Sequence, residues 1–219
     1  MIGLHRLAWR RQRWAVFVAL LVVAFYVWGA TVRSPEFAAL AWRAGSFAEP
    51  WYVLPIGFGA CWAAPLLARE QQRRTVDLAY TQSVSRAGWL LTWIAPVLIV
   101  AAVATTSVYV AFAYVIEPGV YSAWGIVTPE DIPFAVGMVL LAVAVGLFAG
   151  AVFGRTVPAV AAAVAGILAV PYPLRIVAVL MAATETDTFP WYVVLDTYLA
   201  AAVLLAGTAW WMIRRVPRS

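Results

Sequence analysis

The chain has 219 residues, of which 65% are hydrophobic and only 11% charged, with a formal net charge of +5. A soluble domain of this size does not need so much apolar material, so the composition predicts a polytopic membrane protein. The apolar runs are long and continuous rather than alternating, which favours membrane-spanning helices over a β-barrel. The predicted fold class is therefore all-α, with a single transmembrane domain over residues 1–219.

The rarest residue types exclude several kinds of chemistry. The sequence contains no lysine, so it can hold neither a Walker A P-loop nor a Schiff-base lysine. His5 and Cys61 are the single histidine and cysteine, which leaves no intrachain disulfide and no Cys/His metal cluster. We interpret His5 as a surface residue and Cys61 as a small apolar packing residue. The sequence therefore predicts no catalytic residue, metal or cofactor in this chain.

Six apolar runs follow one another along the chain. Residues 1–13 carry arginines on one helical face and are predicted to form an interfacial helix; the alternative is a short basic tail. Residues 69–88 form the one sizeable polar interval between spans on the arginine-rich side. The predicted spans are 14–31, 51–68, 89–114, 134–153, 157–183 and 191–213.

The fifth run has two readings. It meets Pro171 and Pro173 after Val170, and the 14 residues from Val157 to Val170 span roughly 21 Å as a helix. That is short of the roughly 30 Å hydrocarbon core. Either the helix is kinked and continues to about Ala183, or it ends near the prolines and a re-entrant or interfacial segment follows.

Arginine is distributed very unevenly between the loops. Twelve arginines fall on the side of the two termini, whereas two fall on the other side, with Arg175 near it. The positive-inside rule then places both termini in the cytoplasm of a multi-pass protein of the plasma membrane. The twelve are Arg6, Arg10, Arg11, Arg13, Arg69, Arg73, Arg74, Arg86, Arg155, Arg214, Arg215 and Arg218.

The polar interval after the second span has the pattern of an amphipathic helix. Val76, Tyr80 and Val84 recur at helical spacing, and Glu70 precedes Arg73 and Arg74 at pairing distance. A plain solvated connector would need neither this length nor this apolar stripe. We interpret the interval as a cytoplasmic binding surface rather than a catalytic site.

Two further groups are candidates for function. Gly146, Gly150 and Gly154 form consecutive small-xxx-small steps, which predict close helix packing within the chain, or a dimer interface or sliding surface. Arg175 and Asp196 lie within apolar runs toward the outer leaflet and could pair there. Snorkelling of each side chain to the interface is the alternative.

The polar interval also carries a family resemblance. Ala68-Arg69-Glu70, Thr75, Leu78 and Val84-Ser85-Arg86 resemble the loop before the third span in permease subunits of type-2 ABC exporters, especially the compact actinobacterial kind. Trp9-Arg10-Arg11-Gln12-Arg13 resembles their membrane-surface elbow helix. The sequence departs from the family pattern at Arg74, where glycine is usual, at Ser83, where proline is usual, and at Trp93, near which a lysine is usual.

The resemblance implies a division of labour. The interval would be a coupling helix that docks on a separate ABC ATPase subunit, which holds ATP and Mg²⁺. Two permease chains, identical or homologous, would pair around a path for a hydrophobic or amphipathic substrate moved outward. The implied docking residues are Glu70, Arg73, Arg74, Thr75, Val76, Asp77, Leu78, Tyr80, Val84, Ser85 and Arg86.

Two functions of other classes stay open at this stage. One is a standalone secondary transporter, although the spans lack midplane acids and a clear repeated half. The other is a membrane scaffold subunit that transports nothing. The path-facing residues expected by analogy include Phe58, Trp62 and Ile167, and these fit ordinary packing equally well.

Overall fold

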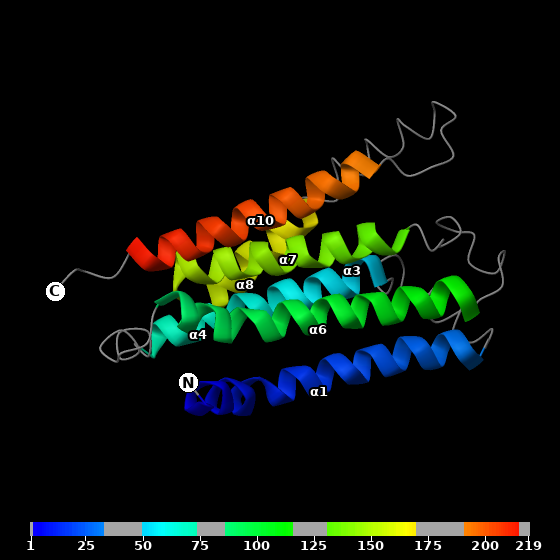
Figure 1. Ribbon diagram of the computed structural model, residues 1–219, viewed down its shortest axis with the longest axis horizontal. Coiled ribbons are helices and arrows are strands. Elements are labelled where there is room, and N and C mark those ends of the chain that lie inside the picture. Colours follow the sequence, from blue (N-terminus) through cyan, green and yellow to red (C-terminus); the bar gives the residue numbers. More distant parts are fainter. Residues whose placement is uncertain (1, 33–49, 74–85, 116–130, 170–190, 215–219) are drawn as a thin grey trace.

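The computed structural model describes residues 2–32, 50–73, 86–115, 131–169 and 191–214, which form an elongated bundle of helices (Figure 1). No strand occurs in these ranges, which confirms the all-α prediction. Helices satisfy their backbone hydrogen bonds internally, as an apolar chain in lipid requires. Helix α1 begins and helix α10 ends at the same end of the bundle (Figure 1).

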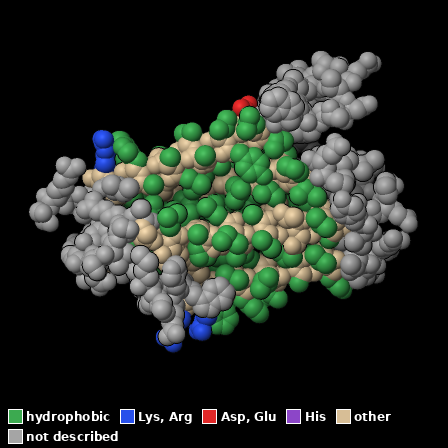
Figure 2. All heavy atoms as spheres, viewed as in Figure 1, with side chains coloured by type: hydrophobic (Ala, Val, Ile, Leu, Met, Phe, Trp, Pro, Cys, Tyr) green, Lys and Arg blue, Asp and Glu red, His purple; other side chains and the backbone are tan. Residues whose placement is uncertain are grey.

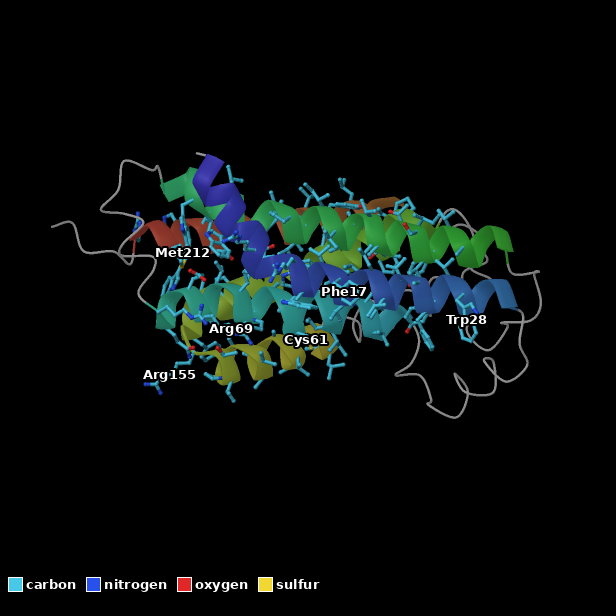
Figure 3. All side chains as sticks on the ribbon, turned by 90° about the horizontal axis from the view of Figure 1, so that it is seen from below. Phe17, Trp28, Cys61, Arg69, Arg155 and Met212 are labelled. Carbon is cyan, nitrogen blue, oxygen red and sulfur yellow. The ribbon has the colours of Figure 1, made fainter. Side chains whose placement is uncertain are left out.

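The first helix, α1, runs over Ile2–Val32 and so joins the predicted interfacial segment to the predicted first span. Figure 3 shows its first turns, in dark blue, at an angle to the rest of the helix. The later part packs against α6 (Arg86–Val115). The Nε2 group of the buried Gln12 donates a hydrogen bond to the Trp93 carbonyl of α6, at 3.1 Å.

The second helical run consists of three consecutive pieces, α3 (Pro50–Pro55), η2 (Ile56–Ala63) and α4 (Ala64–Gln72). The middle piece is a π-helix, and the backbone N–H of Ala64 donates to the Gly59 carbonyl five residues earlier. Pro55 and Pro65 flank this piece and have no N–H to donate. The sequence predicted a span over 51–68 but not its wider central turns.

The remaining helices are α7 (Asp131–Phe153), α8 (Thr156–Ala169) and α10 (Trp191–Arg214). Three described segments are long and apolar enough to cross a membrane, namely Gly88–Ala111, Ile132–Phe153 and Val194–Met212. Shorter apolar helices cover Gln12–Trp28 and Thr156–Ala169. A count of six spans stays a prediction, and residues 170–183 of the predicted fifth span lie outside the described ranges.

Helix α7 lies at the centre of the bundle. It contacts α3, η2, α4, α6, α8 and α10. One group of buried residues, all alanines except one isoleucine, joins it to η2, α4 and α8: Ala60, Ala64, Ala68, Ala142, Ala149, Ala159, Ala163 and Ile167. On the face shown in Figure 2, hydrophobic side chains are spread along the length of the bundle, and the visible arginines lie toward the end where α1 begins.

Candidate coupling site at the end of α4

The predicted coupling interval begins inside a helix. Residues 69–72 continue α4, whereas residues 86–88 already belong to α6. Arg, Glu and Gln are good helix formers, which explains why the apolar run and the start of the polar interval share one helix. Residues 74–85, with most of the predicted docking residues from Arg74 to Ser85, lie outside the described part of the chain. Arg86 is the first residue of α6.

The charged residues at the end of α4 differ in their exposure. Arg69 and Arg73 are exposed, but Glu70 is only 4% exposed. Glu70 therefore lies within the bundle and contributes little to the surface that a partner protein would contact. Its place among the docking residues stays a prediction, which its burial does not favour.

All described arginine side chains whose exposure is defined lie on the surface and belong to the same end of the bundle. Figure 3 labels two of them, Arg69 on α4 and Arg155 in the turn between α7 and α8. The guanidinium of Arg214 lies over the Trp210 ring, 4.3 Å from its centroid. Such contacts are typical of arginines at a membrane interface. The set is Arg10, Arg13, Arg69, Arg73, Arg155 and Arg214.

Gln71 connects α4 to two other helices at this end. Its Nε2 group donates to the Ala151 carbonyl of α7 at 2.9 Å and to the Met212 sulfur of α10 at 3.1 Å. The neighbouring Gln72 accepts a hydrogen bond from the Thr156 hydroxyl, at the start of α8, over 3.3 Å. Sequence reasoning missed both glutamines, because nothing in the polar interval distinguishes them from solvated helix formers.

The turn between α7 and α8 is shaped around Gln71. Gly154 has a φ of +60°, a left-handed conformation that ends α7 and that a residue with a Cβ adopts only with strain. A Cβ at Gly154 would lie 2.6 Å from the Gln71 Oε1 atom. The glycine is thus needed both for the turn and for the space that the Gln71 side chain occupies.

Gly146 and Gly150 lie where α7 meets the second helical run. A Cβ on Gly146 would collide with the Gly59 carbonyl, and a Cβ on Gly150 would lie 2.5 Å from the Ala64 carbonyl. The backbones of α7 and of η2–α4 therefore touch directly. This contact is within one chain; whether the same glycines also serve a dimer interface stays a prediction.

The structure describes only one member of the predicted pair of Arg175 and Asp196. Asp196 is exposed on the second turn of α10, and Arg175 lies outside the described residues. Nearby, the Tyr198 hydroxyl donates to the Pro133 carbonyl at the start of α7, over 3.0 Å. The described residues contain no group of three His, Cys, Asp or Glu side chains that could hold a metal ion.

The expected path residues are packed inside the chain. Phe58, Trp62 and Ile167 are each less than 9% exposed. Cys61, in contrast, is exposed on η2, so its interpretation as a packing residue was wrong. The interpretation rested on residue type alone, because cysteine is usually a small buried residue, and not on which face of the helix meets the bundle.

The sequence matches the family described as ABC-2 membrane transporter related over residues 43–178, more than half of the chain. The chain belongs to the ABC-2 membrane transporter related family. No match was found among curated proteins or solved structures. Membership confirms the resemblance to an ABC-2 permease that the polar interval carried.

Family membership bears on how the end of α4 is interpreted. Members of the family are typically non-catalytic membrane subunits, and membership implies an ABC ATPase partner. The matched range contains η2, α4, the polar interval, α6, α7 and α8. At the end of α4, hydrogen bonds of Gln71 and Gln72 join α4 to α7, α8 and α10.

Proposed function

We propose that this ABC-2 family protein is the transmembrane permease subunit of an ATP-driven exporter. It moves a hydrophobic or amphipathic substrate outward, with energy from ATP hydrolysed on a separate ATPase subunit. The observation that carries the proposal is the family match over residues 43–178, which includes the whole polar interval. The lack of lysine supports it, because ATP hydrolysis by a P-loop then requires another chain.

The docking surface in this proposal is the segment that leaves α4 at Arg73. Val76, Tyr80 and Val84 provide an apolar stripe to bury, and Asp77 with the flanking arginines orients the partner. Arg73 and Arg69 are exposed at the base of this segment. Two permease chains, identical or homologous, would share the ATPase dimer, and both termini of each would lie in the cytoplasm.

The proposal is tested by what copurifies with the chain. The protein is extracted in a mild detergent or directly into nanodiscs, and associated proteins are identified together with their ATPase activity. We expect an ABC ATPase in stoichiometric amount, and a complex mass consistent with two permeases and two ATPases. A lone chain without an ATPase would contradict the proposal and return attention to a secondary transporter or a scaffold subunit.

Substitutions then locate the docking surface. Asp77→Arg reverses a charge and Tyr80→Ala removes an apolar anchor, so each is expected to weaken ATPase binding by about tenfold or more. Asp196→Arg is the matched control for charge reversal, since it changes an exposed aspartate on α10 near the opposite end. Equal loss of ATPase from the Asp77 and Asp196 variants would show that the surface lies elsewhere.

A further inference from the structure

Gln71 occupies the last turn of α4, and its side chain is half-buried between three helices. A carboxamide nitrogen has two N–H groups. In this structure the nitrogen contacts two acceptors on different helices, the Ala151 carbonyl on α7 and the Met212 sulfur on α10. Both acceptor residues are buried. One side chain thus connects the end of α4 to the ends of α7 and α10.

The bond to Ala151 satisfies a backbone group at a helix end. Ala151 lies in the last turn of α7, where carbonyls have no partner further along the helix. The Gly154 N–H closes the same turn by donating to the Gly150 carbonyl. Gln71 supplies a second donor from outside α7, and the absence of a Cβ at Gly154 leaves room for its oxygen.

Hydrogen bonds and apolar packing restrain α4 in different ways. Along most of its length, α4 meets α7 through small residues such as Gly150 and Ala64, whose contact sets the spacing between the helices. Apolar contacts of this kind are non-directional. The two bonds of Gln71 are directional and short, so they fix the position of α4 relative to α7 and α10.

We propose that Gln71 is a positioning residue that transmits displacement of the segment after α4 to α7 and α10 together. This inference rests on the proposed function, because it takes an ATPase docked on residues 74–86 as the source of the displacement. Gln71 lies three residues before residue 74, so a pull on that segment acts on the last turn of α4 as well as on the start of α6. With both bonds present, α7 and α10 move with that turn; without them, only the packing between helices couples their movement.

Neighbouring residues provide matched variants. Gln71→Leu removes both bonds and keeps most of the volume. Met212→Leu conserves volume and removes the sulfur acceptor, so α10 loses its direct bond to α4 while the bond from Gln71 to α7 stays. Gln72→Leu is the control, since Gln72 has the same side chain one position later but is exposed, and its 3.3 Å bond with Thr156 leads to α8.

The test measures the movement of α10 directly. Spin labels are placed at Arg10→Cys on α1 and Arg214→Cys on α10, two exposed positions, in a Cys61→Ser background that removes the single native cysteine. Full-length permease with its copurified ATPase is reconstituted in nanodiscs. Distance distributions are recorded by double electron–electron resonance without nucleotide and with ATP, Mg²⁺ and vanadate.

In the otherwise unmodified complex we expect nucleotide to shift the distance distribution. With Gln71→Leu, ATPase binding and hydrolysis are kept while the shifted population falls about tenfold, as the loss of two hydrogen bonds implies. Met212→Leu also keeps ATPase binding and hydrolysis but lowers the shifted population by less, because a thioether sulfur is a weak acceptor. Gln72→Leu keeps the shift. A loss in both variants, graded by the number of bonds removed, distinguishes transmission from misfolding of either one.

Three results would overturn the inference. The first is a full shift in Gln71→Leu, and the second is an equal loss in Gln72→Leu, which would indicate a general effect of removing polar groups. The third is a parent complex that hydrolyses ATP without any shift, which would refute transmission and leave the proposed function standing. If no ATPase copurifies with the parent protein, the proposed function is contradicted, and the transmission of displacement from an ATPase is contradicted with it.

Discussion

Helices α7 and α1 are both apolar, but they differ in how many neighbours they contact and in which side chains face those neighbours. Helix α7 contacts six other helical pieces and is lined with Gly, Ala and Val. Helix α1 packs mainly against α6 and turns large side chains outward: Trp14, Phe17, Leu20, Leu21, Phe25 and Trp28 are all about half exposed or more. The closest contacts of the central helix are thus made by small residues, whereas the peripheral helix turns most of its large ones outward.

This difference follows from the solvent of a membrane protein. Lipid tails are as apolar as leucine, so burying a large hydrophobic residue between helices gains little over leaving it in lipid. Close contact between backbones still gains dispersion energy, and only small residues allow it. In this chain, two properties distinguish the central helix α7 from α1: its contacts are made by small residues, and it is the more hydrophobic of the two.

The largest effect is expected from adding a methyl group where the backbones of two helices touch. Gly146→Ala would drive a Cβ into the Gly59 carbonyl, so η2 and α7 must separate. We expect a loss of about 3 kcal/mol in the free energy of unfolding, at the upper end for overpacked sites. The measurement is reversible unfolding in mixed micelles, followed by size-exclusion chromatography of the folded fraction.

Gly207→Ala on α10 is the matched control for that experiment. A Cβ at Gly207 meets nothing within 4 Å. Alanine also has a better helix propensity than glycine by about 1 kcal/mol, so this variant should be neutral or slightly more stable. Similar losses in both variants would mean that glycine acts here through helix flexibility and not through close packing.

A second comparison removes volume instead of adding it. Leu147 on α7 is fully buried, and Leu20 on α1 is 59% exposed. Leu147→Ala leaves a cavity between packed helices and is expected to cost about 2–3 kcal/mol, whereas Leu20→Ala should change stability by less than about 0.5 kcal/mol. The same unfolding assay reports both. Equal effects would show that α1 is covered by a partner rather than by lipid.

Sequence reasoning was sufficient for the class of fold and for the family. Long apolar runs predict helices because lipid offers no backbone partner, and the spacing of residues in the polar interval predicts a relative of ABC-2 permeases. Those signals are local in the sequence. The charge asymmetry is local as well, and the described arginines do gather at one end of the bundle, although the side of the membrane they face stays a prediction.

The details of the site depend on residues far apart in the chain. Gln71 finds its acceptors 80 and 141 residues away, so no local pattern marks it as different from other glutamines. The burial of Glu70 and the exposure of Cys61 likewise depend on which face of the second run meets α7. Pro55 and Pro65 were a visible signal for an irregular helix, but they do not specify a π-helix.

A smaller effect is expected where α7 and α10 meet at the opposite end. The Tyr198 ring lies over Gly137, and its hydroxyl donates to the Pro133 carbonyl at an exposed position. Tyr198→Phe keeps the ring and removes the bond, so we expect a loss of about 0.5–1 kcal/mol. Unfolding measurements that show a loss beyond about 2 kcal/mol would mean that polar contacts, and not small residues, hold α10 on α7.

The smallest effect should come from the one buried polar side chain that joins α1 to α6 among the described residues. Gln12 is 2% exposed; its Nε2 donates to the Trp93 carbonyl, but its Oε1 is buried without a partner. Gln12→Leu loses a bond of about 1 kcal/mol and removes an unsatisfied oxygen whose burial costs a similar amount. The free energy of unfolding should therefore stay within about 0.5 kcal/mol of the parent. A loss above about 2 kcal/mol would show that this single amide, rather than the apolar contacts between α1 and α6, holds α1 in place. The two helices would then differ in that polar contacts hold α1 and apolar contacts hold α7.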